Sequence, residues 1–294
     1  MKVSSGHGSV DFAINRREPT DTGVIIGVNR NGPVDHDVPV IKIATPDGTL
    51  KAVLFGYACH NTTSATYLIN GDYAGFAQSE LEKAHPGITA MFLTGCGGDQ
   101  NPQPRGTVEL AEQHGKSLAN EVQKVLEGEL HPVRPPIRTG YTIADLEFSS
   151  FDIELYEKEI LSSDKYIQRR AKLMLEAYNK GWNISRFPYQ VQAVRFNKDL
   201  TILALSGEVV VDYSLKAKKE FANENLFVAG YCNEVQCYIP SRRVLAEGGY
   251  EANSSMIYYG LPGPFANTVE DKIFSAIHKV MKDTGARLSK NNRP

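Results

Sequence analysis

Short apolar runs alternate along the chain with longer segments in which apolar residues recur every three to four positions. The short runs predict buried strands, and the three-to-four spacing predicts amphipathic helices. Because the two kinds of segment alternate, we predict an α/β fold with a mainly parallel or mixed sheet flanked by helices. Strands are predicted at 38–44, 51–58, 88–95, 141–149, 189–197, 200–207 and 226–231, and helices at 71–87, 107–128, 208–224 and 268–285.

Two segments depart from this alternation. Residues 153–180 have helical spacing but carry more charge than their neighbours, so we predict one long helix that forms a solvated arm. The basic residues 286–294 contain few apolar side chains and are predicted to be a disordered tail. The sequence has no internal repeat and no low-complexity tract, so we predict a single domain over 1–294.

The composition is that of a globular protein. The 294 residues are 41% hydrophobic and 22% charged, with a formal net charge of −2, so a core can form without disulfide bonds and no positive field attracts nucleic acid. We therefore expect no nucleic-acid partner. No apolar run is long enough for a membrane-spanning segment or a signal peptide, so we expect neither. Oligomeric state is left open. The cysteines form no CxxC pair and are predicted to be free, buried thiols: Cys59, Cys96, Cys232 and Cys237.

Polar residues that could carry chemistry follow several predicted strands. His60, Glu208 and the glycine-rich segment 94–106 each come directly after one. In α/β sheets, the loops at the carboxyl ends of strands collect functional groups. His60 therefore suits a metal ligand, and Glu208 suits a metal ligand or an acid–base group. The structural alternatives are a buried histidine bonded to a carbonyl group and a glutamate favoured by a helix dipole.

The glycine-rich segment 94–106 is not a nucleotide-binding loop, because it has neither GxGxxG spacing nor a following GK[ST]. Its glycines indicate either a crowded turn or a backbone that approaches a ligand closely. In the second case Asp99, Gln100 and Asn101 would be presented to that ligand. The tyrosine-rich segment 229–265 has the composition of a core, an interface or a pocket wall.

Several separated segments, in order, resemble the neutral/alkaline ceramidase family, and more closely its bacterial ceramidase-like branch. AINRREP at 13–19 is similar to the family's Asn-Arg segment, and FGYACHNTT at 55–63 resembles its zinc-histidine strand. GCGGDQNP at 95–102 resembles its catalytic turn. SGE at 206–208 and CYIPSRRVLAEGGYEA at 237–252 resemble its glutamate and double-tyrosine segments.

This resemblance implies a zinc-dependent hydrolase that cleaves amide, or N-acyl, bonds in a small-molecule or lipid substrate. It implies that His60, Glu208 and Tyr238 are zinc ligands. Tyr250 would face the reacting carbonyl group and stabilise its developing negative charge, and Arg16 would line the substrate pocket. Members of the family are commonly secreted, so the resemblance implies a secreted or periplasmic location if the chain is a fragment of a longer member.

The family's nucleophilic serine is replaced in this sequence. In the turn at 98–102 Asn101 occupies the serine position, and an amide cannot act as that nucleophile. The resemblance then implies attack by zinc-bound water, with Asp99 and Asn101 as the catalytic residues of the turn. Gly98 and Gln100 would contact the substrate. Little ceramide hydrolysis is expected, even with zinc supplied.

A second departure concerns the metal. The family has a His-x-His zinc segment before its Asn-Arg segment, and this sequence contains no such motif, so the resemblance implies an N-terminally shortened member. The Cys96 thiol is a further nucleophile candidate, although no neighbour in the sequence would lower its pKa. The alternative function is a domain that keeps the fold without hydrolase activity. Tight, stoichiometric zinc binding would favour the enzyme.

Overall fold

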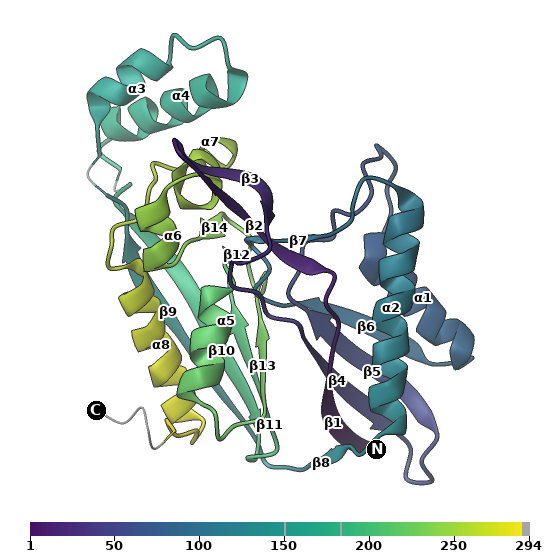
Figure 1. Cartoon of the computed structure of the whole chain (residues 1–294). Coiled ribbons are helices and arrows are strands. Elements are labelled where there is room, and N and C mark those ends of the chain that lie inside the picture. The colour runs from purple at the N-terminus through teal and green to yellow at the C-terminus, as the bar shows by residue number, and fades with distance from the viewer. Residues whose placement is uncertain (150, 183, 290–294) are drawn as a thin grey trace.

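The computed structural model describes residues 1–149, 151–182 and 184–289 and is built in four layers (Figure 1). Two helices cover one face of a four-stranded sheet, a five-stranded sheet packs on its other face, and two further helices cover the outer face of the five-stranded sheet. The covering helices are α5 (Asp212–Glu220) and α8 (Val269–Asp283) on the first side, and α1 (Asp72–Ala84) and α2 (Val108–Glu127) on the second.

The five-stranded sheet has the order β6-β5-β4-β1-β8. Neighbouring strands are antiparallel except for β5 and β6, which are parallel and joined through α1. Its strands are β1 (Lys2–Ser9), β4 (Asp37–Ala44), β5 (Leu50–Tyr57), β6 (Thr89–Thr94) and β8 (His131–Val133).

The four-stranded sheet has the order β13-β11-β10-β9, and its parallel pair is β11 with β13, joined through α5. Both large sheets therefore mix parallel and antiparallel pairs, which confirms the predicted α/β fold with a mixed sheet. Its strands are β9 (Ile137–Glu147), β10 (Arg186–Phe196), β11 (Leu200–Leu205) and β13 (Leu226–Ala229).

Two small sheets lie at the end of the molecule where β5, β6, β11 and β13 finish (Figure 1). One is a parallel pair and the other is a three-stranded antiparallel sheet in the order β3-β2-β7. Their strands are β12 (Glu208–Val209), β14 (Tyr238–Ile239), β2 (Ala13–Thr20), β3 (Gly23–Asn29) and β7 (Gln100–Pro102); the short helices α6 (Arg242–Glu247), η1 (Tyr250–Ser254) and α7 (Met256–Tyr259) follow β14.

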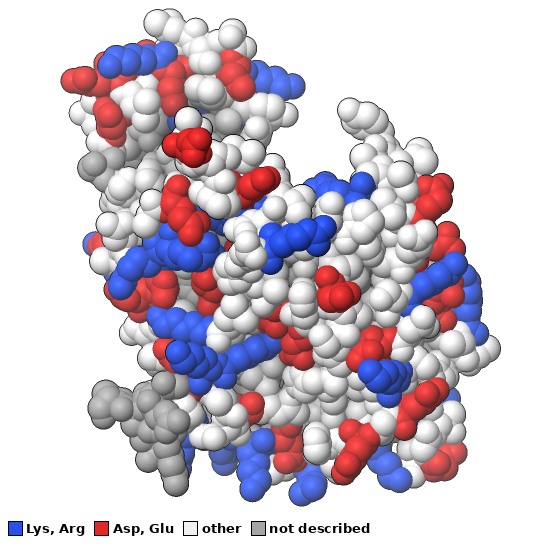
Figure 2. Space-filling view, viewed as in Figure 1, with Lys and Arg blue, Asp and Glu red and all other residues white. Residues whose placement is uncertain are grey.

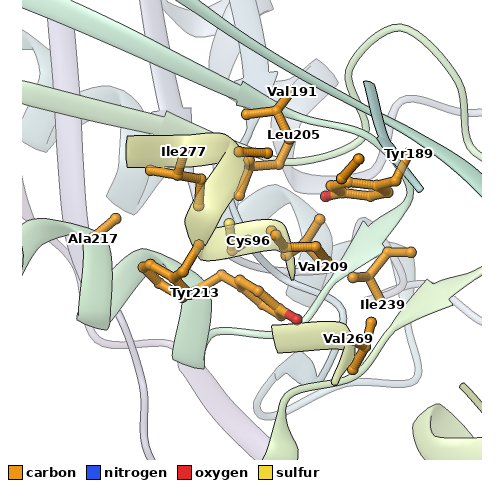
Figure 3. Close-up of a cluster of buried hydrophobic side chains, with 14 of the residues drawn as sticks. Cys96, Tyr189, Val191, Leu205, Val209, Tyr213, Ala217, Ile239, Val269 and Ile277 are labelled. Atoms are coloured by element: carbon orange, nitrogen blue, oxygen red, sulfur yellow. The ribbon is translucent and has the colours of Figure 1, made fainter. Parts of the chain in front are cut away.

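Three apolar cores hold the layers together. One lies between α1, α2 and the five-stranded sheet, and another lies between the two sheets. The largest fills the space between the four-stranded sheet and the helices α5 and α8 (Figure 3). Their residues come from the alternating inward positions of the strands, such as Val191 and Leu205, and from the apolar face of α8, such as Ile277.

The predicted arm is two helices rather than one. Residues 153–180 form α3 (Ile153–Glu159) and α4 (Lys165–Asn179), and the break falls where the Asp164 side chain accepts hydrogen bonds from Tyr166 N and Ile167 N and so begins α4. The two helices pack on each other around a small core of their own that contains Tyr156 and Met174. Acidic and basic side chains are interspersed on the arm and on the rest of the face seen in Figure 2.

The segment after β11 also differs from its prediction. The helix predicted at 208–224 begins only at Asp212, because Glu208 and Val209 form β12 and pair in parallel with Tyr238 and Ile239. The run of β-branched residues at 209–211 suits this extended backbone better than the first turn of a helix.

The first residues of the predicted disordered tail are ordered. Ala286 is buried, Leu288 packs on the largest core, and Ser289 N donates to Glu220 O at 2.9 Å. The disorder prediction is therefore wrong for 286–289, where apolar contacts hold the chain, and its remaining residues lie outside the described part. Among the described helices, none combines the length and the apolar character that crossing a bilayer requires.

Candidate functional site

His60 lies just past β5, where the loops after the parallel strands meet. The His60 backbone N donates to Gln100 O at 3.1 Å, which ties the loop after β5 to the turn after β6. The turn is held closely against its neighbours. A Cβ atom on Gly97 would lie 2.7 Å from Cys59 N, and one on Gly98 would lie 2.5 Å from Glu208 O. The glycines at 97 and 98 are thus required by close contact with the loop after β5 and with β12.

The His60 side chain is neutral in this setting. Burial lowers the pKa of His60 to about 3, and the nearby positive charge of Arg16 acts in the same direction. Its Nε2 donates to Gly98 O at 3.1 Å, so Nδ1 is the unprotonated nitrogen, and it lies 3.3 Å from the Tyr231 hydroxyl. A neutral imidazole of this kind keeps a free lone pair at neutral pH, as a metal ligand must.

Glu208 lies beside His60 and opposite Tyr238. The β12–β14 pair places Glu208 directly opposite Tyr238, and Glu208 Oε2 is 3.9 Å from His60 Nε2. Glu208 Oε1 accepts a hydrogen bond from the Tyr259 hydroxyl, and Oε2 lies 3.3 Å from the Tyr231 hydroxyl. Burial raises the pKa of Tyr259, and the hydrogen bond to Glu208 raises it further. The carboxylate is thus held by two phenols.

Arg16 enters the same site from β2 and lies against two tyrosines. Its guanidinium carbon is 5.3 Å from the centre of the Tyr238 ring and 5.6 Å from that of Tyr250. The two rings are themselves in edge-to-face contact, 5.3 Å apart. Burial raises the pKa of Tyr238 and the negative charge of Glu208 adds to the rise, while Arg16 opposes it.

One nitrogen of Arg16 is left without a partner. Its Nε donates to Glu251 Oε1 at 2.7 Å, and its Nη1 reaches Asn101 Oδ1 at 3.5 Å. Its Nη2 is buried and has no hydrogen-bond partner. A buried donor of this kind costs free energy unless a ligand satisfies it, so Nη2 is suited to a substrate oxygen.

Glu251 anchors this arginine and was not singled out from the sequence. It is 1% exposed and also accepts from Arg17 Nη1 at 2.5 Å. Successive residues of a strand normally point to opposite faces, but the pairing of β2 with β3 shifts between Asn15 and Arg17, so Arg16 and Arg17 both reach Glu251. Nothing in the local sequence pattern indicates this arrangement, since the two partners are separated by 235 positions in the chain.

The carboxylate of Asp99 makes its hydrogen bonds to groups inside the protein. It is fully buried, and its Oδ1 accepts from Val211 N at 2.8 Å and from Gln100 Nε2 at 3.1 Å, while Oδ2 accepts from Asn15 Nδ2 at 2.9 Å. Burial raises the pKa of Asp99 despite these hydrogen bonds. Its contacts hold the turn to β2 and to the start of α5. The Gln100 side chain likewise contacts Asp99 and Pro33 O, and of the residues expected in this turn it is Asn101 whose side chain contacts Arg16.

The Cys96 thiol lies in the largest apolar core rather than in the site (Figure 3). It is fully buried next to Val209 and Tyr213, and burial raises its pKa well above the ordinary value. A thiol without access to solvent cannot reach a substrate, and its raised pKa disfavours the reactive thiolate. The prediction of Cys96 as a nucleophile candidate is therefore wrong, because the strand that precedes it directs it into the core.

The structure thus brings together His60, Glu208, Tyr238, Tyr250, Arg16 and Asn101. It adds Tyr231 and Tyr259, which the sequence placed in a tyrosine-rich segment without a role. Tyr231 has a φ of +57°, a conformation that is strained for a residue with a side chain. Such strain is found at functional sites, and no sequence pattern reveals it.

Zinc, which the resemblance implies, would need a mixed set of donors here. Among the residues that the structure describes, no three His, Cys, Asp or Glu side chains gather as a metal site. The unprotonated Nδ1 of His60 and Oε2 of Glu208 each lie 3.3 Å from the Tyr231 hydroxyl, so these two donor atoms face the same point and could share one ion. Tyr238, opposite Glu208, is the available third donor. The residues fit zinc as a histidine–glutamate–tyrosine set.

Comparisons with known proteins give a similarity in structure only. No protein-family model matches the sequence, and a comparison with curated proteins found no match. The crystal structure of neutral ceramidase from Pseudomonas aeruginosa matches with a TM-score of 0.64 and 15% identity, over 98% of this chain and 53% of that one. A ceramidase complexed with C2 matches with a TM-score of 0.64 and 14% identity, over 98% of this chain and 54% of that one. The chain spans about half the length of these enzymes, and over that half it has the fold of neutral ceramidase.

Proposed function

We propose that the protein is a zinc-dependent hydrolase that cleaves an amide bond in an N-acyl substrate. The observation that carries the proposal is the convergence of His60, Glu208 and Tyr238, from three separate segments, beside a buried arginine with a free nitrogen. The fold of neutral ceramidase supports it.

The donor set defines where the metal would be held. His60 is neutral, Glu208 is an oxygen donor, and Tyr238 lies opposite Glu208. Zinc, when bound, would polarise a carbonyl group and lower the pKa of water. The chain's own contribution to specificity is Arg16, whose unpartnered Nη2 would bind a substrate oxygen between the rings of Tyr238 and Tyr250.

Water is the nucleophile in this proposal. Asn101 occupies the position of the family's serine, its amide lies against Arg16, and the Cys96 thiol is shut in the core. The proposed substrate is an N-acyl amide that water attacks directly, so that no acyl group becomes bound to the enzyme. Ceramide itself should be a poor substrate, because loss of a catalytic nucleophile typically costs about 10⁴ to 10⁶ in rate.

A zinc titration and a substrate panel test the proposal. The purified chain should bind one zinc ion in competition with a chromophoric chelator, and Glu208→Gln should weaken that binding at least about tenfold. Glu234→Gln, on the exposed loop before β14, is the matched control and should bind zinc as the wild type does.

The substrate panel should contain short N-acyl amides and a fluorogenic ceramide. We expect hydrolysis of the short amides that stops on addition of a chelator, and much slower turnover of the ceramide. Failure of the wild type to take up zinc would overturn the proposal.

A second candidate function is a binding domain without hydrolase activity. The asparagine at position 101 favours this candidate, because an amide cannot act as the nucleophile but still contacts Arg16. That candidate predicts weak zinc binding and no amide cleavage by the same assays.

A further inference from the structure

The two tyrosines that hold Glu208 come from different elements. Tyr231 follows β13 in the body of the protein, and its backbone N donates to Gly207 O at 3.0 Å. Tyr259, which donates to Glu208 Oε1, is the last residue of the four-residue helix α7. A helix this short gains little stability from its own hydrogen bonds, so its position depends on what packs against it.

The two-helix arm packs against α7 on both sides of Tyr259. Arg169 Nη2, from α4, donates to Tyr258 O at 2.7 Å. The Tyr166 ring, also from α4, lies 5.0 Å from the Tyr258 ring in an edge-to-face contact. These contacts fix the residue directly before Tyr259.

The residues directly after Tyr259 are held in the same way. Gly260 has a left-handed conformation with φ +69°, and a Cβ atom there would lie 2.7 Å from Leu173 Cδ1. The Tyr156 hydroxyl, from α3, donates to Pro262 O at 3.2 Å. Contacts from both arm helices therefore bracket Tyr259.

We propose that Tyr259 is a positioning residue for Glu208 and that the two-helix arm holds Tyr259 in place. The proposal deepens the proposed function, on which it rests for the role of Glu208 as a zinc ligand. Groups that hydrogen-bond to a ligating carboxylate fix its orientation, and removing them typically weakens metal binding 10- to 100-fold. The arm, which supplies no ligand itself, thereby becomes part of the site.

Zinc affinity tests the action of Tyr259 on Glu208. Tyr259→Phe keeps the ring and removes the hydroxyl that Glu208 Oε1 accepts from, so zinc binding should weaken about 10- to 100-fold. Tyr258→Phe is the matched control on the same helix, because Tyr258 is 44% exposed and packs on Tyr166. Its zinc affinity should equal that of the wild type. Equal affinities for Tyr259→Phe and the wild type would overturn the proposal.

A metal-free measurement tests the same contact independently of zinc. Urea unfolding of the wild type, Tyr259→Phe, Glu208→Ala and the double variant gives a double-mutant cycle in which each single variant removes the hydrogen bond. Because a hydrogen bond to a charged group contributes about 1.5–3 kcal/mol, the two effects on the unfolding equilibrium constant should be non-additive by about tenfold or more. Additive effects would overturn the inference whether or not the chain binds zinc. If the wild type binds no zinc but Tyr259 and Glu208 are strongly coupled, the proposed function is overturned while the contact between the two residues is supported.

Hydrogen exchange tests the contribution of the arm. Arg169→Ala removes the hydrogen bond to Tyr258 O and should speed amide exchange in 256–262 at least about fivefold relative to the wild type. Lys172→Ala, at an exposed position of α4, should leave exchange in 256–262 unchanged. Unchanged exchange in the Arg169→Ala protein would show that the arm does not hold α7 and would overturn that part of the inference.

Discussion

His7 has a hydrogen-bond acceptor at each ring nitrogen, which fixes it as a cation. Its Nδ1 lies 2.8 Å from Asp37 Oδ1 and its Nε2 lies 2.6 Å from Asn225 Oδ1. Asn225 Nδ2 donates to Asp199 O, so Asn225 Oδ1 can only accept and both His7 nitrogens must donate. Burial by itself would lower the pKa of His7, but the hydrogen bond and the negative charge of Asp37 outweigh it and raise the pKa above 6.5.

We expect the stability of the protein to fall as pH rises through the folded-state pKa of His7. The folded chain binds this proton more tightly than the unfolded chain, so the contribution is complete below about pH 6.5 and is lost at higher pH. Urea unfolding at several pH values between 6 and 9 measures the decline. His7→Gln has no proton to lose and should decline less than the wild type; identical declines would contradict the role of His7.

At the scale of elements, the buried carboxylate of Glu251 ties η1 to β2. Glu251→Gln keeps the shape of the side chain but leaves the Arg16 and Arg17 guanidinium groups without their shared buried charge. Removing one partner of a buried ion pair costs about 3–5 kcal/mol, so we expect a loss of that size in the free energy of unfolding. Urea denaturation measures it.

The control for this prediction is Glu247→Gln. Glu247 also pairs with Arg17, at 3.1 Å, but its side chain is 34% exposed, and partly exposed pairs contribute about 1 kcal/mol or less. Similar losses for the two variants would mean that burial of Glu251 does not decide its effect.

At the scale of the whole molecule, the two large sheets are packed too closely for a side chain at Gly56. A Cβ atom there would lie 2.4 Å from Phe227 Cζ, on the facing sheet, and 2.7 Å from Leu93 O. Gly56→Ala should therefore push the sheets apart and destabilise the protein by about 1–3 kcal/mol, measured by thermal or urea unfolding.

Gly75→Ala is the matched substitution in open space. Gly75 lies in α1, and a Cβ atom there would meet nothing within 4 Å. Alanine favours a helix over glycine by about 1 kcal/mol, so this variant should be more stable than the wild type. A loss of stability in both variants would show that the close packing of the sheets is not what requires Gly56.

Local sequence patterns are enough to predict the α/β class and the elements in which apolar residues recur regularly. The helix predicted at 107–128 is α2, and the Thr107 side chain begins it by accepting from Leu110 N. The strand predicted at 51–58 is β5, so His60 was correctly placed just past a strand end. These predictions succeed because apolar spacing and caps report local backbone preference and the face that will be buried.

The three-dimensional fold was needed to identify the strands β1, β2 and β3. Polar residues and glycines obscure their strand pattern, and β1 pairs with β4 rather than with the next strand along the chain. The fold made a further set of contacts visible: Glu208 lies in a strand, Asp99 bonds within the protein, and Tyr231 and Tyr259 hold Glu208. The physical reason is the same in each case. The partners lie far apart in the chain, and a local pattern shows which face of an element is buried but not what that face will meet.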